Sequence, residues 1–472
     1  MPRSDDEKRY RELKAYTEEV VRQLNEIRRG HIHIESLNIK YDFPEEAISY
    51  HHWRNRIYIF IAASLIGLVA VGFASLSDTS IHLFEILYDI EPRLPFVITP
   101  LGLLLAKWLT ERVFKGAEGS GIPQVIAAMT PGQSEKLLSF RAGIGKVIGT
   151  NIALIAGASV GREGPTVQIG AIIARFFSKI LRAPVMYSER SLILAGGASG
   201  VSAAFNTPIA GIVFAIEELG KSFYERETSI LLMSIVVSGL CALSLSGPYF
   251  YFGSTQVGLM GWEQMYAIPI GFLTGLSGGF FSLTLIKGSL WVQKQSTKKA
   301  YALTFVFGLI IAAIGYYTNG ATFGTGYGEA KALLEGTSQV QHYSAFKFVV
   351  TALSYLSGVP GGIFAPTLSI GAGIGSWLTD VFHTTHSQAF VLLGMVSFFA
   401  GVIRSPITAV IIVSEMTHNH LLLLPLLMAS LVAYGAARLT SKESLYHTFA
   451  MRYSPKPHPT PAGDPEKPKG DS

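Results

Sequence analysis

Long uncharged stretches constrain this chain more than any other feature of its sequence. Residues 57–76 form a run of 20 uncharged, mostly apolar residues, enough for a helix to cross a bilayer core of roughly 30 Å. Further stretches follow to residue 437, many of them interrupted by Gly and Pro. Only 15% of the residues are charged, against about 25% in a typical soluble domain. The sequence therefore predicts an all-α polytopic membrane protein with tilted and broken helices.

Charges beside these stretches predict the orientation of the chain. Arg54 and Arg56 precede the first stretch, and Asp78 and Glu85 follow it. Basic residues mark the cytoplasmic side of membrane proteins, so we expect a cytoplasmic N-terminus. Arg438 and other basic residues after the last stretch place the C-terminus there too. The net charge of +5 is modest and does not indicate nucleic acid as a partner.

We expect four parts along the chain. These are a cytoplasmic N-terminal helical segment (1–55), a first membrane repeat (56–250), a second membrane repeat (251–450) and a disordered cytoplasmic tail (451–472). The first segment is either a partner-binding helix or a solvated helix that only packs on the membrane domain. The tail is rich in Pro and charged residues, a composition typical of disorder.

The two membrane repeats are visible as matched segments. Gly161-Arg-Glu-Gly-Pro-Thr-Val-Gln-Ile-Gly170 matches Gly362-Ile-Phe-Ala-Pro-Thr-Leu-Ser-Ile-Gly371 at an offset of 201 residues (362 − 161). The segment from Phe205 to Glu217 matches the one from Ile403 to Glu415 at 198 (415 − 217), and Gly119-Ser-Gly121 matches Gly324-Thr-Gly326 at 205 (324 − 119). Transporters with internal repeats place their substrate at the repeat interface, on discontinuous helices. The matched segments alone leave open whether the halves are parallel or inverted.

Each matched segment places Gly and Pro where a helix would begin. Helix N-termini present unpaired N–H groups and a partial positive charge. Several such ends meeting inside the membrane would bind an anion without a lysine or arginine. Alternatively, the segments only kink helices for packing. Glu163 lies between glycines in one of them, and an intramembrane carboxylate is a candidate functional group. The alternative for Glu163 is a structural ion pair with Arg162.

The motifs resemble those of the CLC family of chloride channels and chloride/proton exchangers. The resemblance is carried by Gly119-Ser-Gly-Ile-Pro123, Gly161-Arg-Glu-Gly-Pro165, Gly361-Gly-Ile-Phe-Ala-Pro366 and Tyr446, in the family's order, and covers roughly residues 57–450. It is similar to the bacterial exchanger type without C-terminal regulatory domains. The motif residues are Gly119, Gly121, Ile122, Pro123, Gly161, Arg162, Gly164, Pro165, Gly361, Gly362, Ala365 and Pro366.

The resemblance implies an inverted repeat and a homodimer in the bilayer of a bacterial inner membrane, exchanging chloride for protons. It implies that Ser120, Tyr446 and the backbone N–H groups of Ile363 and Phe364 bind chloride. Glu163 would be the external gate and proton acceptor, and Glu218 would transfer protons on the internal side. From residue type alone, Ser120 is a helix cap, Tyr446 a membrane-interface aromatic and Glu218 a solvated carboxylate at a helix end.

Two other classes of function compete with exchange. A passive chloride channel of the same family is the first, and Glu218 argues against it because channels of the family generally lack this carboxylate. An intramembrane serine protease is the second, because Gly197-Ala-Ser199-Gly200 has its Gly-x-Ser-Gly pattern. The histidine base of such an enzyme has no candidate inside an apolar stretch, and small-residue packing explains the glycines. We expect no enzyme activity, no cofactor and no metal, since zinc and phosphate-loop motifs are absent from the sequence.

Overall fold

The computed structural model describes residues 50–180, 188–220, 228–247, 251–253, 255–337 and 342–453. The chain divides into two compact units, 1–56 and 57–472. The described part of the chain is helical, and five of its helices are long and apolar enough to cross a membrane. The predictions for the N-terminal segment and the tail lie outside the described residues, apart from 50–55 and 451–453.

The described helices fall into two sets that share most of their order of long and short members. The first set is α3 (Tyr50–Ile90), α4 (Pro95–Arg112), α5 (Ile122–Ala128), α6 (Ser134–Leu137), α7 (Phe140–Ile155), α8 (Glu163–Ile180), α9 (Glu189–Phe205), α10 (Pro208–Phe214) with the π-helical turn η2 (Ala215–Leu219), and α11 (Thr228–Ser246). The second set is the 3₁₀ turn η3 (Gly261–Tyr266), α12 (Ala267–Gln293), α13 (Thr297–Tyr317), α14 (Tyr327–Leu334), α15 (Tyr343–Leu356), α16 (Phe364–Val381), α17 (Ser387–Ile403), α18 (Pro406–Thr417), α19 (Leu423–Thr440) and α20 (Leu445–Ala450).

The sequence repeat is a structural repeat. Helix α8 packs on α9, and α16 packs on α17 in the same way. Asn206 and Arg404, which are equivalent at the 198-residue offset (404 − 206), end α9 and α17 in the left-handed conformation, with φ of 57° and 63°. Asn adopts this conformation readily. Arg404 is held there by hydrogen bonds from its guanidinium group to the carbonyls of Ala437 and Ser441.

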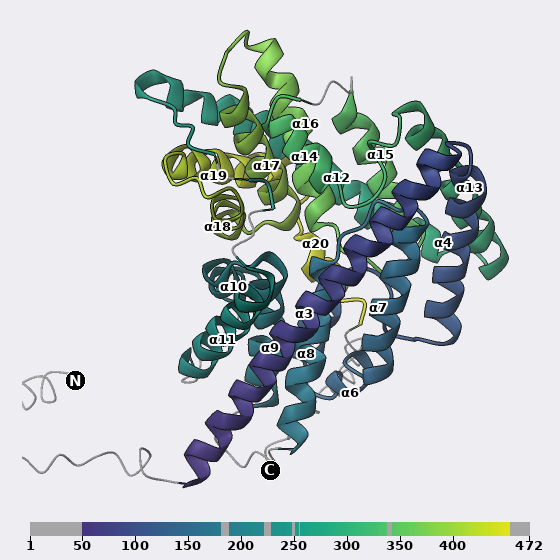
Figure 1. Cartoon of the computed structure of the whole chain (residues 1–472), viewed down its shortest axis with the longest axis vertical. Coiled ribbons are helices and arrows are strands. Elements are labelled where there is room, and N and C mark those ends of the chain that lie inside the picture. Colours follow the sequence, from purple (N-terminus) through teal and green to yellow (C-terminus); the bar gives the residue numbers. More distant parts are fainter. Residues whose placement is uncertain are drawn as a thin grey trace, which may run out of the picture. The chain divides into compact units, whose positions relative to one another are not determined.

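Equivalent glycines of the two halves bind each other. Gly161 and Gly362 exchange two backbone hydrogen bonds, of 2.7 and 2.6 Å, in an isolated antiparallel bridge. Such an exchange has local two-fold symmetry, so α8 and α16 begin at the same place and run apart. In Figure 1, α8 lies below the short helix α20 and α16 lies above it. The fold is therefore an all-α architecture of two inverted repeats with broken helices.

Glycines allow the paired helices to touch backbone to backbone. A Cβ atom on Gly170 of α8 would overlap the carbonyl oxygen of Gly196 in α9, and Gly371 and Gly394 repeat this contact between α16 and α17. Gly200 meets the Thr166 carbonyl in the same manner. This packing accounts for Gly200 of the Gly-x-Ser-Gly pattern, and Gly197 packs against the side chains of Leu219 and Val125, so neither glycine needs a catalytic role.

We predict that Gly170→Ala lowers the stability of the folded protein by about 1–3 kcal/mol, because the added methyl group would force α8 and α9 apart. Gly72→Ala is the matched control, since a Cβ atom at Gly72 in α3 would have no neighbour within 4 Å. Thermal unfolding in detergent measures both variants. Equal melting temperatures for the two variants would contradict the close contact.

Candidate functional site

Three loops of the sequence motifs meet at one place. The N–H of Gly361 donates to the carbonyl of Gly119 at 3.0 Å, and Gly161 bonds to Gly362 as described above. A Cβ atom on Gly164 would overlap the hydroxyl oxygen of Ser120. Loops 119–123, 161–165 and 361–366 therefore form a single cluster at the starts of α5, α8 and α16.

Two hydroxyl groups lie buried at this cluster. Ser120 is 1% exposed and Tyr446 is 0% exposed. Their hydroxyl groups face each other, yet neither makes a hydrogen bond of good geometry within the described part of the chain. Burying a hydroxyl without a partner is costly, so this pair of donors suits a ligand.

The first turn of α16 adds backbone donors. Ile363 is the N-cap of this helix and Phe364 its first residue, and both are fully buried. The N–H groups of a first helical turn have no acceptor within their own helix. The Phe364 ring packs 6.0 Å from the ring of Tyr446, which places this turn beside the hydroxyl pair. Hydroxyl and amide donors around one buried point can bind a small anion.

The side-chain positions exclude three alternatives left open by residue type. Ser120 makes no cap, because α5 begins after Gly121 without a side-chain capping bond. Tyr446 is buried and is not an interfacial aromatic. Glu218 is 0% exposed, so it is not a solvated carboxylate.

Glu163 is the first residue of α8 and is 0% exposed. Its Oε1 atom accepts a hydrogen bond of 2.9 Å from the hydroxyl of Tyr327. The backbone amide of Ala365, in the first turn of α16, faces the same carboxyl group. Two helix N-termini therefore surround this carboxylate and stabilise its negative charge.

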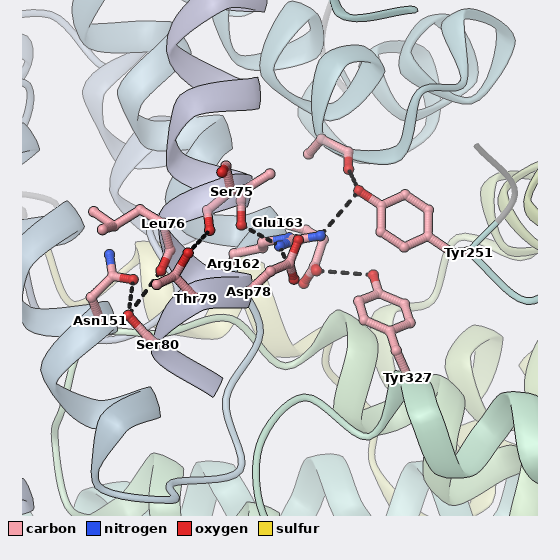
Figure 2. A network of polar contacts seen from close by, with 12 residues as sticks. Ser75, Leu76, Asp78, Thr79, Ser80, Asn151, Arg162, Glu163, Tyr251 and Tyr327 are labelled. Atoms are coloured by element: carbon pink, nitrogen blue, oxygen red, sulfur yellow. Dashed lines mark hydrogen bonds and ion pairs between the residues drawn. The ribbon is translucent and has the colours of Figure 1, made fainter. Parts of the chain in front are cut away.

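Arg162 has other partners than Glu163. Its guanidinium group donates to Asp78 at 2.5 Å and to the carbonyl of Ala74, both in α3, and to the Tyr251 hydroxyl at 3.3 Å. Figure 2 shows Arg162 reaching between Asp78 and Tyr251. The alternative of a structural Arg162–Glu163 ion pair is therefore wrong.

Glu218 lies in the π-helical turn η2 and accepts a hydrogen bond of 2.6 Å from the hydroxyl of Ser405, the N-cap of α18. Its neighbour Glu217 accepts from the backbone N–H groups of Ile407 and Thr408 at 3.1 and 2.7 Å. Glu217 thus caps α18 of the other half, and it fixes η2 against α18.

The second half of the chain caps a helix of the first half in the same way. Glu415, the equivalent of Glu217, accepts from the N–H of Ala210 at 3.0 Å. Ala210 lies in the first turn of α10. Each half of the chain therefore supplies a carboxylate to a helix start of the other.

Two buried lysines support the loops. Lys146 of α7 donates to the carbonyls of Glu118 and Gly119 at 3.0 and 2.8 Å. Lys347 of α15, 201 residues later (347 − 146), donates to the carbonyls of Thr322, Phe323 and Gly324. Both lysines are fully buried. Their hydrogen bonds hold the backbone of the Gly-Ser-Gly loop and of its repeat, Gly324-Thr-Gly326.

A cavity of about 820 Å³ opens from Ser120 toward one side of the protein. Gly119, Ser120 and Pro123 line its inner end. Four basic residues and two acidic residues also line it: Lys107, Lys115, Lys136, Arg452, Glu111 and Glu118. The cavity connects Ser120 with the side of the chain on which the sequence predicts the cytoplasm.

Comparison with known proteins decides the family. Residues 102–438 match the family model described as Voltage gated chloride channel. The chain belongs to the voltage-gated chloride channel family. As a member of this CLC family, it is a multi-pass membrane protein.

The relatives of this CLC chain include named exchangers. The H(+)/Cl(-) exchange transporter ClcA of Vibrio cholerae is 30% identical over 444 residues, which cover 84% of this chain and 89% of the transporter. The protein of the same name from Vibrio campbellii is 28% identical over 429 residues, with the same coverage. A slow cyanobacterial Cl-/H+ antiporter of known crystal structure is 26% identical, with a TM-score of 0.74 over 84% of this chain and 97% of that one.

Several residues of the site are absent from the motif analysis. They are Asp78, Lys146, Tyr251, Tyr327 and Lys347. Lys146 and Lys347 did carry a signal, because each directly precedes an uncharged stretch and the two are separated by the repeat offset. An isolated charge at such a position indicates a buried partner.

In this CLC chain, we predict that Lys146→Met weakens chloride binding at least tenfold. Removing the ammonium group leaves the carbonyls of Glu118 and Gly119 without their donor, so the loop that carries Ser120 shifts. Isothermal titration of chloride into the purified protein measures the change. Lys298→Met is the control, since Lys298 is an exposed residue of α13 and removing its ammonium group leaves the motif loops untouched. An unchanged affinity in Lys146→Met would refute the role of this lysine.

Proposed function

We propose that this chain is a secondary active chloride/proton antiporter. The observation that carries the proposal is a pair of fully buried carboxyl groups, Glu163 and Glu218, each beside a helix N-terminus. Burying a charged carboxylate in a membrane costs free energy, so a carboxylate found there indicates a functional site. A carboxyl group that changes between charged and neutral forms inside the membrane is suited to carrying protons.

Chloride binds between the hydroxyl groups of Ser120 and Tyr446 and the backbone N–H groups of Ile363 and Phe364. The burial of both hydroxyl groups without a partner among the described residues supports this assignment. Helix N-termini and hydroxyl groups attract an anion with partial charges. Such a site binds moderately, so chloride can leave it. A free lysine in the same place would hold the ion more tightly.

The exchange cycle uses one carboxylate as both gate and proton carrier. Charged Glu163 occupies the anion path beside the starts of α8 and α16. Chloride arriving from the internal cavity displaces the carboxylate, which takes up an external proton and becomes neutral. On its return Glu163 passes that proton inward by way of Glu218 and is again charged. Chloride and proton thus move in opposite directions.

Relatives and residues both favour exchange over a passive chloride channel. The Vibrio relatives are named H(+)/Cl(-) exchange transporters, and Glu218 is present and buried here. The chemistry is ion transfer through protein groups alone, so the proposal includes no cofactor, metal or enzymatic step.

The proposal extends to the assembly and its membrane. The chain is a homodimer in the bilayer of a bacterial inner membrane, with both termini in the cytoplasm. Its parts are residues 1–55, 56–250, 251–450 and 451–472, as the sequence predicts. Helices α10, α11, α18 and α19 lie together along the left edge of Figure 1. Large apolar side chains of these helices are exposed, Ile209 of α10 and Leu431 of α19 among them, which supports this group of helices as the dimer interface.

We predict that Glu163→Gln abolishes proton movement while chloride still flows, because the amide cannot take up and release a proton. Chloride efflux from liposomes with simultaneous recording of external pH measures both ions. Proton uptake driven by a chloride gradient in the unsubstituted protein separates an antiporter from a channel. Its absence would refute proton coupling.

Glu218→Gln is predicted to spare chloride movement and to stop proton movement. The amide still accepts a hydrogen bond from Ser405 but cannot relay a proton. Glu217→Gln is the matched control, because Glu217 caps α18 and we expect its loss to lower stability with coupling intact. Proton pumping by Glu218→Gln against a gradient would show that the internal residue is wrongly assigned.

A further inference from the structure

Gly324-Thr-Gly326 matches Gly119-Ser-Gly121 and is the second copy of this motif. It has no role in the proposed transport cycle. In the structure, Gly326 is the N-cap of α14, with φ of 85°, and Tyr327 is its first residue. Gly121 and Ile122 have the same relation at the start of α5. The first copy brings Ser120 to the anion path, whereas the second copy brings Tyr327.

Tyr327 contacts the gating carboxyl group directly. Its hydroxyl donates to Oε1 of Glu163 at 2.9 Å (Figure 2). Among the described residues, no other side chain donates a hydrogen bond to this carboxyl group, and its Oε2 atom has no partner there. The tyrosine hydroxyl is therefore the side-chain contact that fixes where the carboxylate rests.

The hydroxyl of Tyr327 is held in place from two directions. The preceding loop is anchored by Lys347 through the carbonyls of Thr322, Phe323 and Gly324. The Tyr327 ring stacks on Tyr251, with centroids 4.9 Å apart. Tyr251 in turn donates to the carbonyl of Ala204 at 2.8 Å and accepts from Arg162. A donor fixed by its surroundings imposes its geometry on the group that it binds.

We propose that Tyr327 is a positioning residue for the gate, docking the charged Glu163 carboxylate through its hydroxyl group. The inference rests on the proposed function, in which Glu163 is the gate. The phenol keeps its proton and donates a hydrogen bond. Hydrogen bonds to an ionised acceptor are about twice as strong as neutral ones, so the contact favours the charged, docked form. Tyr327 thereby sets the external pH at which the gate is released.

Tyr327→Phe tests the docking contact, because it removes one oxygen atom and keeps the ring on Tyr251. Without this donor the carboxylate takes up protons more readily. We expect the external pH at which chloride efflux from liposomes is half-maximal to rise by about one unit. Chloride efflux at neutral pH should rise with it. An unchanged midpoint would overturn the proposal.

Tyr343→Phe is the matched control. Its hydroxyl is equally a buried tyrosine group, but it pairs with Ser369 at 2.6 Å and not with Glu163. We expect this variant to keep the pH midpoint of the unsubstituted protein. Thermal unfolding of both variants shows whether either change acts by weakening the fold.

A double-substitution cycle separates docking from a structural role. In a Glu163→Ala background there is no carboxylate to dock, so adding Tyr327→Phe should change neither chloride efflux nor its pH dependence. An effect of Tyr327→Phe in that background would show that Tyr327 acts by another route and would overturn the proposal.

The same assays distinguish this inference from the exchange function. Chloride gradients that drive no proton uptake would refute exchange. If Glu163→Ala still removes the pH dependence of efflux in that case, the shift of the pH midpoint in Tyr327→Phe still decides the docking role. If efflux in the unsubstituted protein does not depend on external pH, Glu163 is no gate and both proposals fail.

Discussion

The exchange of two hydrogen bonds between Gly161 and Gly362 holds the starts of α8 and α16 against each other. Helix ends inside a membrane are costly, because their N–H groups have no water to bind. Here two such ends share one location, and a third, at α5, joins them through the Gly361–Gly119 bond. Side chains larger than hydrogen at several of these positions would overlap neighbouring atoms. The site therefore depends on backbone contacts that glycine permits.

Positive charge near the site is used indirectly. Lys146 and Lys347 each donate hydrogen bonds to backbone carbonyls, and Arg162 donates to Asp78 and Tyr251. The groups at the buried point are amides and hydroxyls. In the proposed transport cycle, chloride would therefore be held by partial charges and not by an ion pair, as suits a site through which ions pass.

The sequence predicted the repeated architecture, and the structure confirms it. The prediction succeeded because Gly and Pro at matched offsets mark the points where helices begin or end. It also predicted that the three motif loops belong together. Tyr327 and Asp78 could not be found in this way, since each acts through one contact made by tertiary packing. A tyrosine after Gly326 reads equally well as a surface residue. Arg162 next to Glu163 suggested an ion pair, but the two side chains have separate hydrogen-bond partners, Asp78 for Arg162 and Tyr327 for Glu163.

The crossed caps of Glu217 and Glu415 have a consequence for the origin of the fold. A single half of this chain, folded alone, has a helix start without its carboxylate and a carboxylate without its helix start. In a pair of such halves, the carboxylate of each copy caps the helix start of the other, because the contact is the same in each direction. An ancestral gene encoding one half would therefore have yielded a self-complementary pair. Joining the two copies into one polypeptide keeps these crossed caps and leaves each copy free to diverge, as Ile122 and Tyr327 have done after the matched glycines Gly121 and Gly326.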